Sequence, residues 1–276
     1  MPKVVVYDSS PSNALDRPYI LYERLPGHSL QSLWATLNTA QRQSAAREIA
    51  HFTRDLSQLR SRCPGVISIR NTVFDFKQDV VRVEQMPLSR RCSPITTSYA
   101  ALPLLAGPMT TRELLLDLAA CQRSNAGKML AGAPVHEHVW TRMQGMIDTL
   151  HRRGLIPDSE AFSLLRTQLA ADDVLVSVRD EGTVDVTGVL SWGGAVFGPT
   201  FLGKQVPGFL LGGGVGGLEA FEEVMGEEWC SVACRLEMEL ARRLWEVLLN
   251  GVVGGSDVFA AEEVLDEFEK VVMVRE

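Results

Sequence analysis

The sequence lacks the features that mark most membrane and secreted proteins. No run reaches the roughly 18 apolar residues that a membrane-spanning helix needs, and no long apolar signal core follows Met1-Pro2-Lys3. The five cysteines are odd in number and include no C-x-x-C pair, so a disulfide framework is not expected. We therefore expect a cytoplasmic protein with reduced thiols and no membrane partner.

Positive charge is also scarce. Lysine and arginine number 27 against 34 aspartate and glutamate residues, which gives a net charge of -7, and no basic stripe stands out along the chain. A nucleic-acid partner is therefore not expected. Apolar residues, in contrast, are plentiful: 46% of the 276 residues are hydrophobic, enough for the core of one large domain or two small ones.

The hydrophobic patterns along the chain indicate a mixed α+β protein. Apolar residues at steps of three and four predict helices, and alternating valines on either side of a turn at residues 179–182 predict a β-hairpin. The expected strands lie at residues 4–7 and 18–23, and the expected helices at 30–37, 39–60, 111–124, 138–153, 229–248 and 257–271. Residues 198–217, rich in glycine, are expected to form a loop. Because these elements do not alternate as βαβ units, the expected class is α+β.

Three stretches carry a resemblance to a known family. Residues 17–27 (RPYILYERLPG) are similar to a family segment, "RPYILMERIPG", in which the last N-lobe strand meets the hinge. Gly107-Pro108 with residues 111–113 is similar to a family helix start, and residues 187–199 are similar to "TGIIDWEFAGWGP". In this order and spacing, the stretches resemble fungal members of the aminoglycoside phosphotransferase family, the small-molecule relatives of protein kinases. The resemblance implies a protein-kinase-like fold with a mostly helical C-lobe and a reduced N-lobe.

The resemblance also implies a division of the chain. Residues 1–27 correspond to remnant N-lobe strands with the hinge, and residues 28–276 to the C-lobe, with an irregular insert at 66–108 and a hairpin at 174–190. The segment before the hinge is too short for the family's glycine-rich strands and lysine strand, and Lys3 lies too near the hinge to replace that lysine. We therefore expect an N-terminally truncated member, through genuine loss or an incomplete gene model.

The positions that the resemblance assigns to phosphoryl transfer have changed. Gln168 stands at the position of the catalytic aspartate, Asp173 at that of a metal-binding asparagine, and Ser191 at that of an aspartate metal ligand. A neutral amide is not a useful base near neutral pH, and loss of a general base costs about 10²- to 10⁴-fold in rate. A serine hydroxyl brings no charge to Mg²⁺, which prefers carboxylate oxygens. The family's transfer machinery is therefore expected to be degenerate.

Three hypotheses about function stay open. The first is a pseudokinase that serves as a binding or scaffold module for a small molecule or a protein, with no cofactor. The second is an ATP-dependent small-molecule hydroxyl kinase that uses a residual Mg²⁺ site at Asp172 and Asp173, with the hinge-like Glu23, Arg24 and Leu25 offering backbone groups to the adenine ring. The third is a fragment without separate activity. The first is favoured because both Gln168 and Ser191 have changed.

Other short patterns have simpler explanations. The glycine run at residues 210–217 lacks the Lys-Ser/Thr of a phosphate-binding loop and is expected to be a linker. His136-Glu137-His138 does not match H-E-x-x-H and is expected to be a solvated helix start. Trp192 is expected in the core, and Cys230 and Cys234 along one packed helix face.

Overall fold

The computed structural model describes residues 3–8, 10, 12–70, 80–85, 106–129, 136–166, 169–192, 195–211, 216–252 and 254–273. The chain forms two compact units. The first, here called the hairpin unit, comprises Met1–Asp55, Gln168–Gly194 and Val206–Glu227. The second, the helical unit, comprises Leu56–Thr167, Ala195–Gln205 and Glu228–Glu276.

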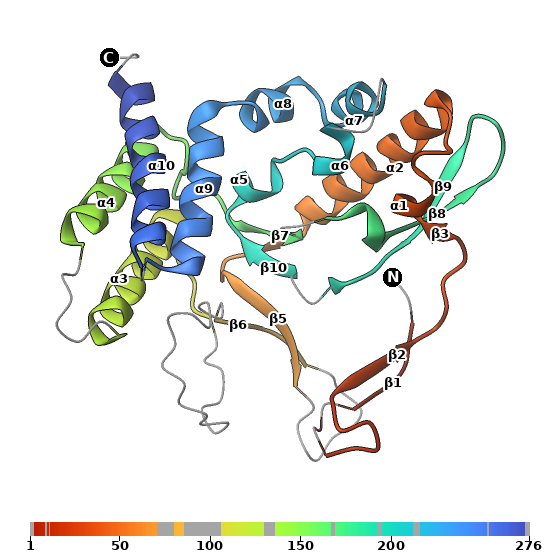
Figure 1. The fold of residues 1–276 in the computed structure, drawn as a ribbon, viewed down its shortest axis with the longest axis horizontal. Coiled ribbons are helices and arrows are strands. Elements are labelled where there is room, and N and C mark those ends of the chain that lie inside the picture. Colours follow the sequence, from red (N-terminus) through yellow and green to blue (C-terminus); the bar gives the residue numbers. More distant parts are fainter. Residues whose placement is uncertain are drawn as a thin grey trace. The chain divides into compact units, whose positions relative to one another are not determined.

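The hairpin unit contains two small antiparallel sheets (Figure 1). In the first, β1 (Val4–Asp8) pairs with β2 (Tyr19–Tyr22). In the second, the order is β3-β8-β9, formed by β3 (His28–Ser29), β8 (Val174–Val178) and β9 (Val184–Val189). The helices of this unit are α1 (Leu30–Leu33), α6 (Gly208–Leu211), α7 (Gly217–Met225) and most of α2 (Thr39–Gln58).

Helix α2 supports the β8–β9 hairpin through small side chains and hydrogen bonds. Its buried residues are Ala45, Ala46, Ile49 and Ala50, and the buried hairpin residues are Val174, Val176, Val184 and Val189. The Ser44 hydroxyl accepts a hydrogen bond from Val184 N at 3.1 Å. At the hairpin turn, the amides of Asn38 and Gln41 donate to the carbonyl oxygens of Glu181 and Asp180 at 2.7 and 2.9 Å. The start of α2 thus holds the turn at residues 179–183.

The helical unit has a five-stranded antiparallel sheet in the order β4-β7-β10-β5-β6. Its strands are β4 (Arg60–Ser61), β5 (Gly65–Arg70), β6 (Val80–Glu84), β7 (Phe162–Arg166) and β10 (Ala195–Gly198). Its helices are α3 (Thr111–Met129), α4 (Glu137–Arg152), α5 (Thr200–Gly203), α9 (Leu236–Asn250), α10 (Gly255–Met273) and nearly all of α8 (Glu227–Ala233).

Apolar stripes bring the long helices of this unit together, with α10 against both α4 and α9 (Figure 1). On α4 the buried residues recur at helical spacing: Val139, Trp140, Met143, Met146, Ile147 and Leu150. They join buried residues of α3, α9 and α10 in one core cluster. Helix α3 begins with a capping box, in which Glu113 N donates to the Thr110 hydroxyl and Thr110 N to the Glu113 carboxylate.

Several expected elements differ from those observed. The single helix expected at 229–248 is wrong: α8 ends at Ala233 and α9 begins at Leu236. The break is stabilised from a distance, because Arg242 donates to the Ala233 carbonyl at 2.9 Å and satisfies an otherwise open helix end. The expected loop at 198–217 is also wrong in part, since it contains α5 and α6.

The mixed α+β class is confirmed by these helices and antiparallel sheets. Within the described residues, no helix combines the length and apolarity that a membrane span requires.

Candidate functional site

The described candidate site residues lie on the β8–β9 hairpin or on segments that contact it. Its register is Val174↔Val189, Leu175↔Gly188 and Val176↔Val186, so Thr187 is the extra residue of a β-bulge on β9. The bulge directs the Thr187 hydroxyl to Pro26, whose carbonyl oxygen accepts a hydrogen bond at 2.6 Å. This contact ties the hinge-like segment to the hairpin.

Two glycines allow the hinge-like segment to lie close to the hairpin. A Cβ on Gly188 would come within 2.2 Å of Leu25 Cδ1, and a Cβ on Gly27 within 2.5 Å of the Val176 carbonyl oxygen. Gly27 also has a φ of +100°, a conformation that residues with a side chain rarely adopt. Leu25 is half-buried as a result, whereas Glu23 and Arg24 are exposed.

The backbone of the hinge-like residues is only partly available. Glu23 N donates to the Lys3 carbonyl oxygen at 2.8 Å, in continuation of the β1–β2 ladder. Its N–H is therefore already satisfied, and an adenine ring would have to use other backbone groups of Glu23, Arg24 and Leu25. The adenine-binding role of these three residues stays a prediction.

Two carboxylates stand at the start of β8. Ala171–Asp173 forms a single 3₁₀ turn in which Asp173 N donates to the Ala170 carbonyl at 3.1 Å. Asp172 is exposed and accepts a hydrogen bond from the Ser29 hydroxyl at 3.1 Å, which links it to the β3–α1 junction. Asp173 is half-buried.

Ser191 lies two residues beyond the end of β9, next to the residue that pairs with Asp173. That residue is Leu190, whose N–H donates to the Asp173 carbonyl oxygen at 2.8 Å. Ser191 is exposed and has a φ of +58°, in the left-handed region. A non-glycine residue held there stores roughly 1–3 kcal/mol of backbone strain, a feature often found at functional sites.

Trp192 helps to hold this strained turn. Its indole N–H donates to the Val189 carbonyl at 2.9 Å, and its ring meets Phe52 edge-to-face at 5.9 Å. The expectation that Trp192 lies in the core is corrected: it is half-buried, because it covers the end of β9.

Gln168, at the catalytic-aspartate position, lies outside the described residues. The structure therefore brings together Asp172, Asp173 and Ser191 with the hinge-like segment on one hairpin, and the assignment of Gln168 stays a prediction. Among the described residues, no group of three or more His, Cys, Asp and Glu side chains is arranged to hold a metal ion.

The remaining sequence patterns have structural roles. A hydrogen bond of 2.8 Å joins His138 to Glu262 of α10, and Glu137 forms an ion pair of 2.7 Å with Arg123 of α3, so this helix start contacts two other helices. In the glycine run, Gly216 caps α7 with a φ of +100°. Cys234 is exposed at the α8–α9 break, which corrects the expected packing of both cysteines along one face.

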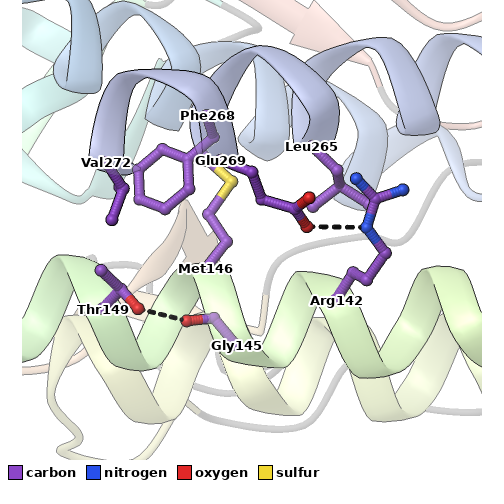
Figure 2. Close-up of a pocket in the computed structure, with 8 residues that line it drawn as sticks. All are labelled: Arg142, Gly145, Met146, Thr149, Leu265, Phe268, Glu269 and Val272. Atoms are coloured by element: carbon purple, nitrogen blue, oxygen red, sulfur yellow. Dashed lines mark hydrogen bonds and ion pairs between the residues drawn. The ribbon is translucent and has the colours of Figure 1, made fainter. Parts of the chain in front are cut away.

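A groove that the sequence did not suggest lies between α4 and α10 (Figure 2). It has a volume of about 270 Å³ and an apolar floor that includes Met146, Leu265 and Phe268. Arg142 crosses one end and pairs with Asp266 and Glu269 at 2.6 and 2.8 Å. The hydrogen bonds that Arg142 donates, chiefly to Glu269 and then to Asp266, raise the pKa of its guanidinium. None of the candidate site residues lines this groove.

Comparisons with known proteins agree with this architecture. No protein-family model matches the chain. Two solved structures have a TM-score of 0.50 and 14% sequence identity: an ADP-bound aminoglycoside phosphotransferase, APH(2'')-Ib, and a streptomycin–ATP complex of APH(2'')-IIa. The matches cover 96% of this chain and 74% and 73% of those chains. The fold is the kinase-like fold of the aminoglycoside phosphotransferases.

Curated proteins from one fungal species also resemble this chain. Subtelomeric hrmA-associated cluster proteins from two Aspergillus fumigatus strains, Af293 and CEA10, are 24% and 23% identical to this chain. Each match covers 76% of this chain and 49% of the relative. The chain thus spans about half the length of the curated relatives it matches.

Proposed function

We propose that this chain is an aminoglycoside-phosphotransferase-like domain that does not transfer phosphate, a pseudokinase that acts by binding a small molecule or a protein. One observation supports the proposal: Leu190 N donates to the Asp173 carbonyl oxygen, and the residue that follows Leu190 is a neutral serine, Ser191. By resemblance, a carboxylate belongs at that position. Mg²⁺ held near triphosphate requires carboxylate or similar oxygen ligands, and a hydroxyl supplies no negative charge.

The neighbouring carboxylate, Asp172, is exposed and accepts a hydrogen bond from the Ser29 hydroxyl through Oδ1, so it would bind Mg²⁺ in competition with water and with this contact. The strain at Ser191 supports a retained binding role, because a left-handed non-glycine turn persists only where its surroundings fix it. Among the described residues Cys63, Cys121, Cys230 and Cys234 form no disulfide, which is in keeping with a reducing compartment, and the resemblance to fungal family members supports the cytoplasm of a fungal cell.

Calorimetric titration of the full chain with ATP, with and without Mg²⁺, tests this function. The proposal predicts that Mg²⁺ does not strengthen nucleotide binding, because the second charged ligand is absent. Micromolar binding of Mg·ATP, together with phosphate transfer to any hydroxyl compound, would overturn it.

A second candidate is an ATP-dependent small-molecule hydroxyl kinase with its Mg²⁺ at Asp172 and Asp173. The observation in its favour is that both carboxylates occupy one short turn beside the hairpin, with Asp172 open to solvent. This candidate predicts ATP hydrolysis that Asp173→Ala abolishes and that Asp185→Ala, on the same hairpin, leaves intact. Absence of hydrolysis in the unmodified chain rejects it.

A further inference from the structure

The two-stranded sheet β1–β2 exposes an unusual amount of apolar surface. The side chains of Val5, Leu21 and Tyr7 are 67%, 54% and 52% exposed. The exposed large apolar residues of the two strands are Val4, Val5, Val6, Tyr7, Ile20, Leu21 and Tyr22. A sheet of only two strands is marginally stable in water, and large apolar side chains left exposed along both of its strands are typical of an interaction site.

One edge of this sheet is ready to accept another strand. Glu23 N donates toward β1, to the Lys3 carbonyl at 2.8 Å. Backbone groups alternate in direction along an antiparallel strand, so those of Ile20 and Tyr22 point away from β1. In the described part of the chain, the sheet has the order β1-β2 and no third strand lies at that edge. The β1 edge is less suitable, because its pairing is interrupted by a bulge at Val5.

We propose that two copies of this chain associate through the free edges of β2, forming a four-stranded antiparallel sheet in the order β1-β2-β2-β1. A two-fold axis requires that residues with outward backbone groups face each other. The two central registers that meet this condition place Ile20 opposite Ile20, or Leu21 opposite Leu21, of the second copy.

Charge selects between these registers. With Ile20 on the axis, Arg17 of each copy lies opposite Glu23 of the other, which gives two opposite-charge pairs. With Leu21 on the axis, Arg17 lies opposite Leu25 and Glu23 opposite Tyr19, and neither charge is matched. Arg17 and Glu23 are both exposed and accessible for this pairing. Because β2 is flanked by a positive residue, Arg17, at one end and a negative residue, Glu23, at the other, the partner strand that fits it best is β2 of a second copy.

The same register gives favourable apolar neighbours. Tyr19 of one copy faces Leu21 of the other, an aromatic–aliphatic cross-strand pair of the kind that stabilises sheets. The two Ile20 residues exchange backbone hydrogen bonds, and Tyr22 N–H reaches the Pro18 carbonyl. Pro18 lacks an N–H, so it accepts at this position without leaving an unpaired donor.

Light scattering during size-exclusion chromatography, over a range of concentrations of the full chain, tests the interface. We expect the mass to rise from one chain of 30.4 kDa toward two as concentration increases. Arg17→Glu and Glu23→Arg should each weaken the dimer roughly tenfold or more, because each creates two like-charge pairs. The double variant Arg17→Glu/Glu23→Arg should restore it, and Glu181→Arg, an exposed position in the turn between β8 and β9, should have little effect.

Hydrogen exchange provides an independent readout that does not depend on the variants. The amides of Ile20 and Tyr22 should become protected as concentration rises, and the turn at residues 179–183 should not. A monomer at every concentration, with these amides unprotected, overturns the proposal. A dimer that survives Arg17→Glu, or that the charge swap fails to restore, also overturns it, because its interface then lies elsewhere.

Discussion

Leu190 and Asp173 are joined by a backbone hydrogen bond of 2.8 Å from the amide of the first to the carbonyl of the second. Through this bond the end of β9 is fixed to the start of β8. Ser191 is therefore one residue removed from the backbone partner of Asp173. The chemistry available to the hairpin depends on these two side chains, one carboxylate and one alcohol.

Replacing the alcohol by a carboxylate should create a metal site. In Ser191→Asp we expect divalent-cation affinity to rise by about tenfold or more, because ligand charge largely sets such affinity. Aspartate tolerates the left-handed conformation at φ +58°, so the substitution adds little strain. Mn²⁺ binding followed by electron paramagnetic resonance measures the effect. Ser231→Asp, on exposed α8, is the charge-matched control; equal affinity in both variants would contradict the expectation.

The close contact between the hinge-like segment and β8 should depend on Gly27. Gly27→Ala places a methyl group within 2.5 Å of the Val176 carbonyl and forces a side chain into φ +100°. We expect a loss of at least about 1–3 kcal/mol in the free energy of unfolding. Urea denaturation measures it. Gly182→Ala, whose nearest neighbour is 3.7 Å away, is the control in the same hairpin; similar losses in the two variants would show that the close approach does not matter.

The hairpin turn should make stability depend on acid pH. Hydrogen bonds from Gly182 N and Thr183 lower the pKa of Asp180 below its ordinary value. Because the folded pKa is the lower one, this contribution is fully present above the unfolded pKa and is lost as pH falls through the folded pKa. Carbon NMR titration of the Asp180 carboxyl should give a midpoint below that of a model aspartate. A midpoint at or above the model value would contradict the turn geometry.

The ion pairs of Arg142 should stabilise the contact between α4 and α10. Arg142→Ala leaves Asp266 and Glu269 close together without the cation they share, and we expect a loss of about 1 kcal/mol, the upper end for surface pairs. Thermal unfolding in low and high salt measures it, and salt should reduce the difference. Arg179→Ala removes an exposed ion pair with Asp185 and should cost less than about 1 kcal/mol. Equal losses would mean that sharing one arginine between two carboxylates does not strengthen these pairs.

The long regular elements could be predicted from sequence, because their periodicity is local. Helix α4 repeats buried residues from Val139 to Leu150 at helical spacing, and the valines of β8 and β9 alternate around a turn. Strand β7 escaped prediction because four of its five residues are buried in succession, which removes the period of two. The break between α8 and α9 was hidden because its stabilising group, Arg242, lies nine residues beyond Ala233.

For the candidate site, the sequence predicts which positions belong to it but not how they are arranged in space. The resemblance named Asp173 and Ser191, but their proximity depends on the hairpin register and on the Leu190 bond. The contact between Ser29 and Asp172 joins residues 143 positions apart, and no local pattern encodes it. The strain at Ser191 depends equally on three-dimensional surroundings. The α4–α10 groove likewise arises where two helices pack together, and the sequence pattern of each helix alone predicts only an amphipathic helix.

The central claim is that the hairpin carries too little negative charge to hold magnesium triphosphate for transfer. The most direct measurement is phosphate release from γ-labelled ATP by the full chain, in excess Mg²⁺ and with the Asp173→Ala variant alongside. We predict that both proteins release phosphate at the rate of the buffer alone. Release by the unmodified chain that Asp173→Ala abolishes would contradict the claim and identify a working kinase.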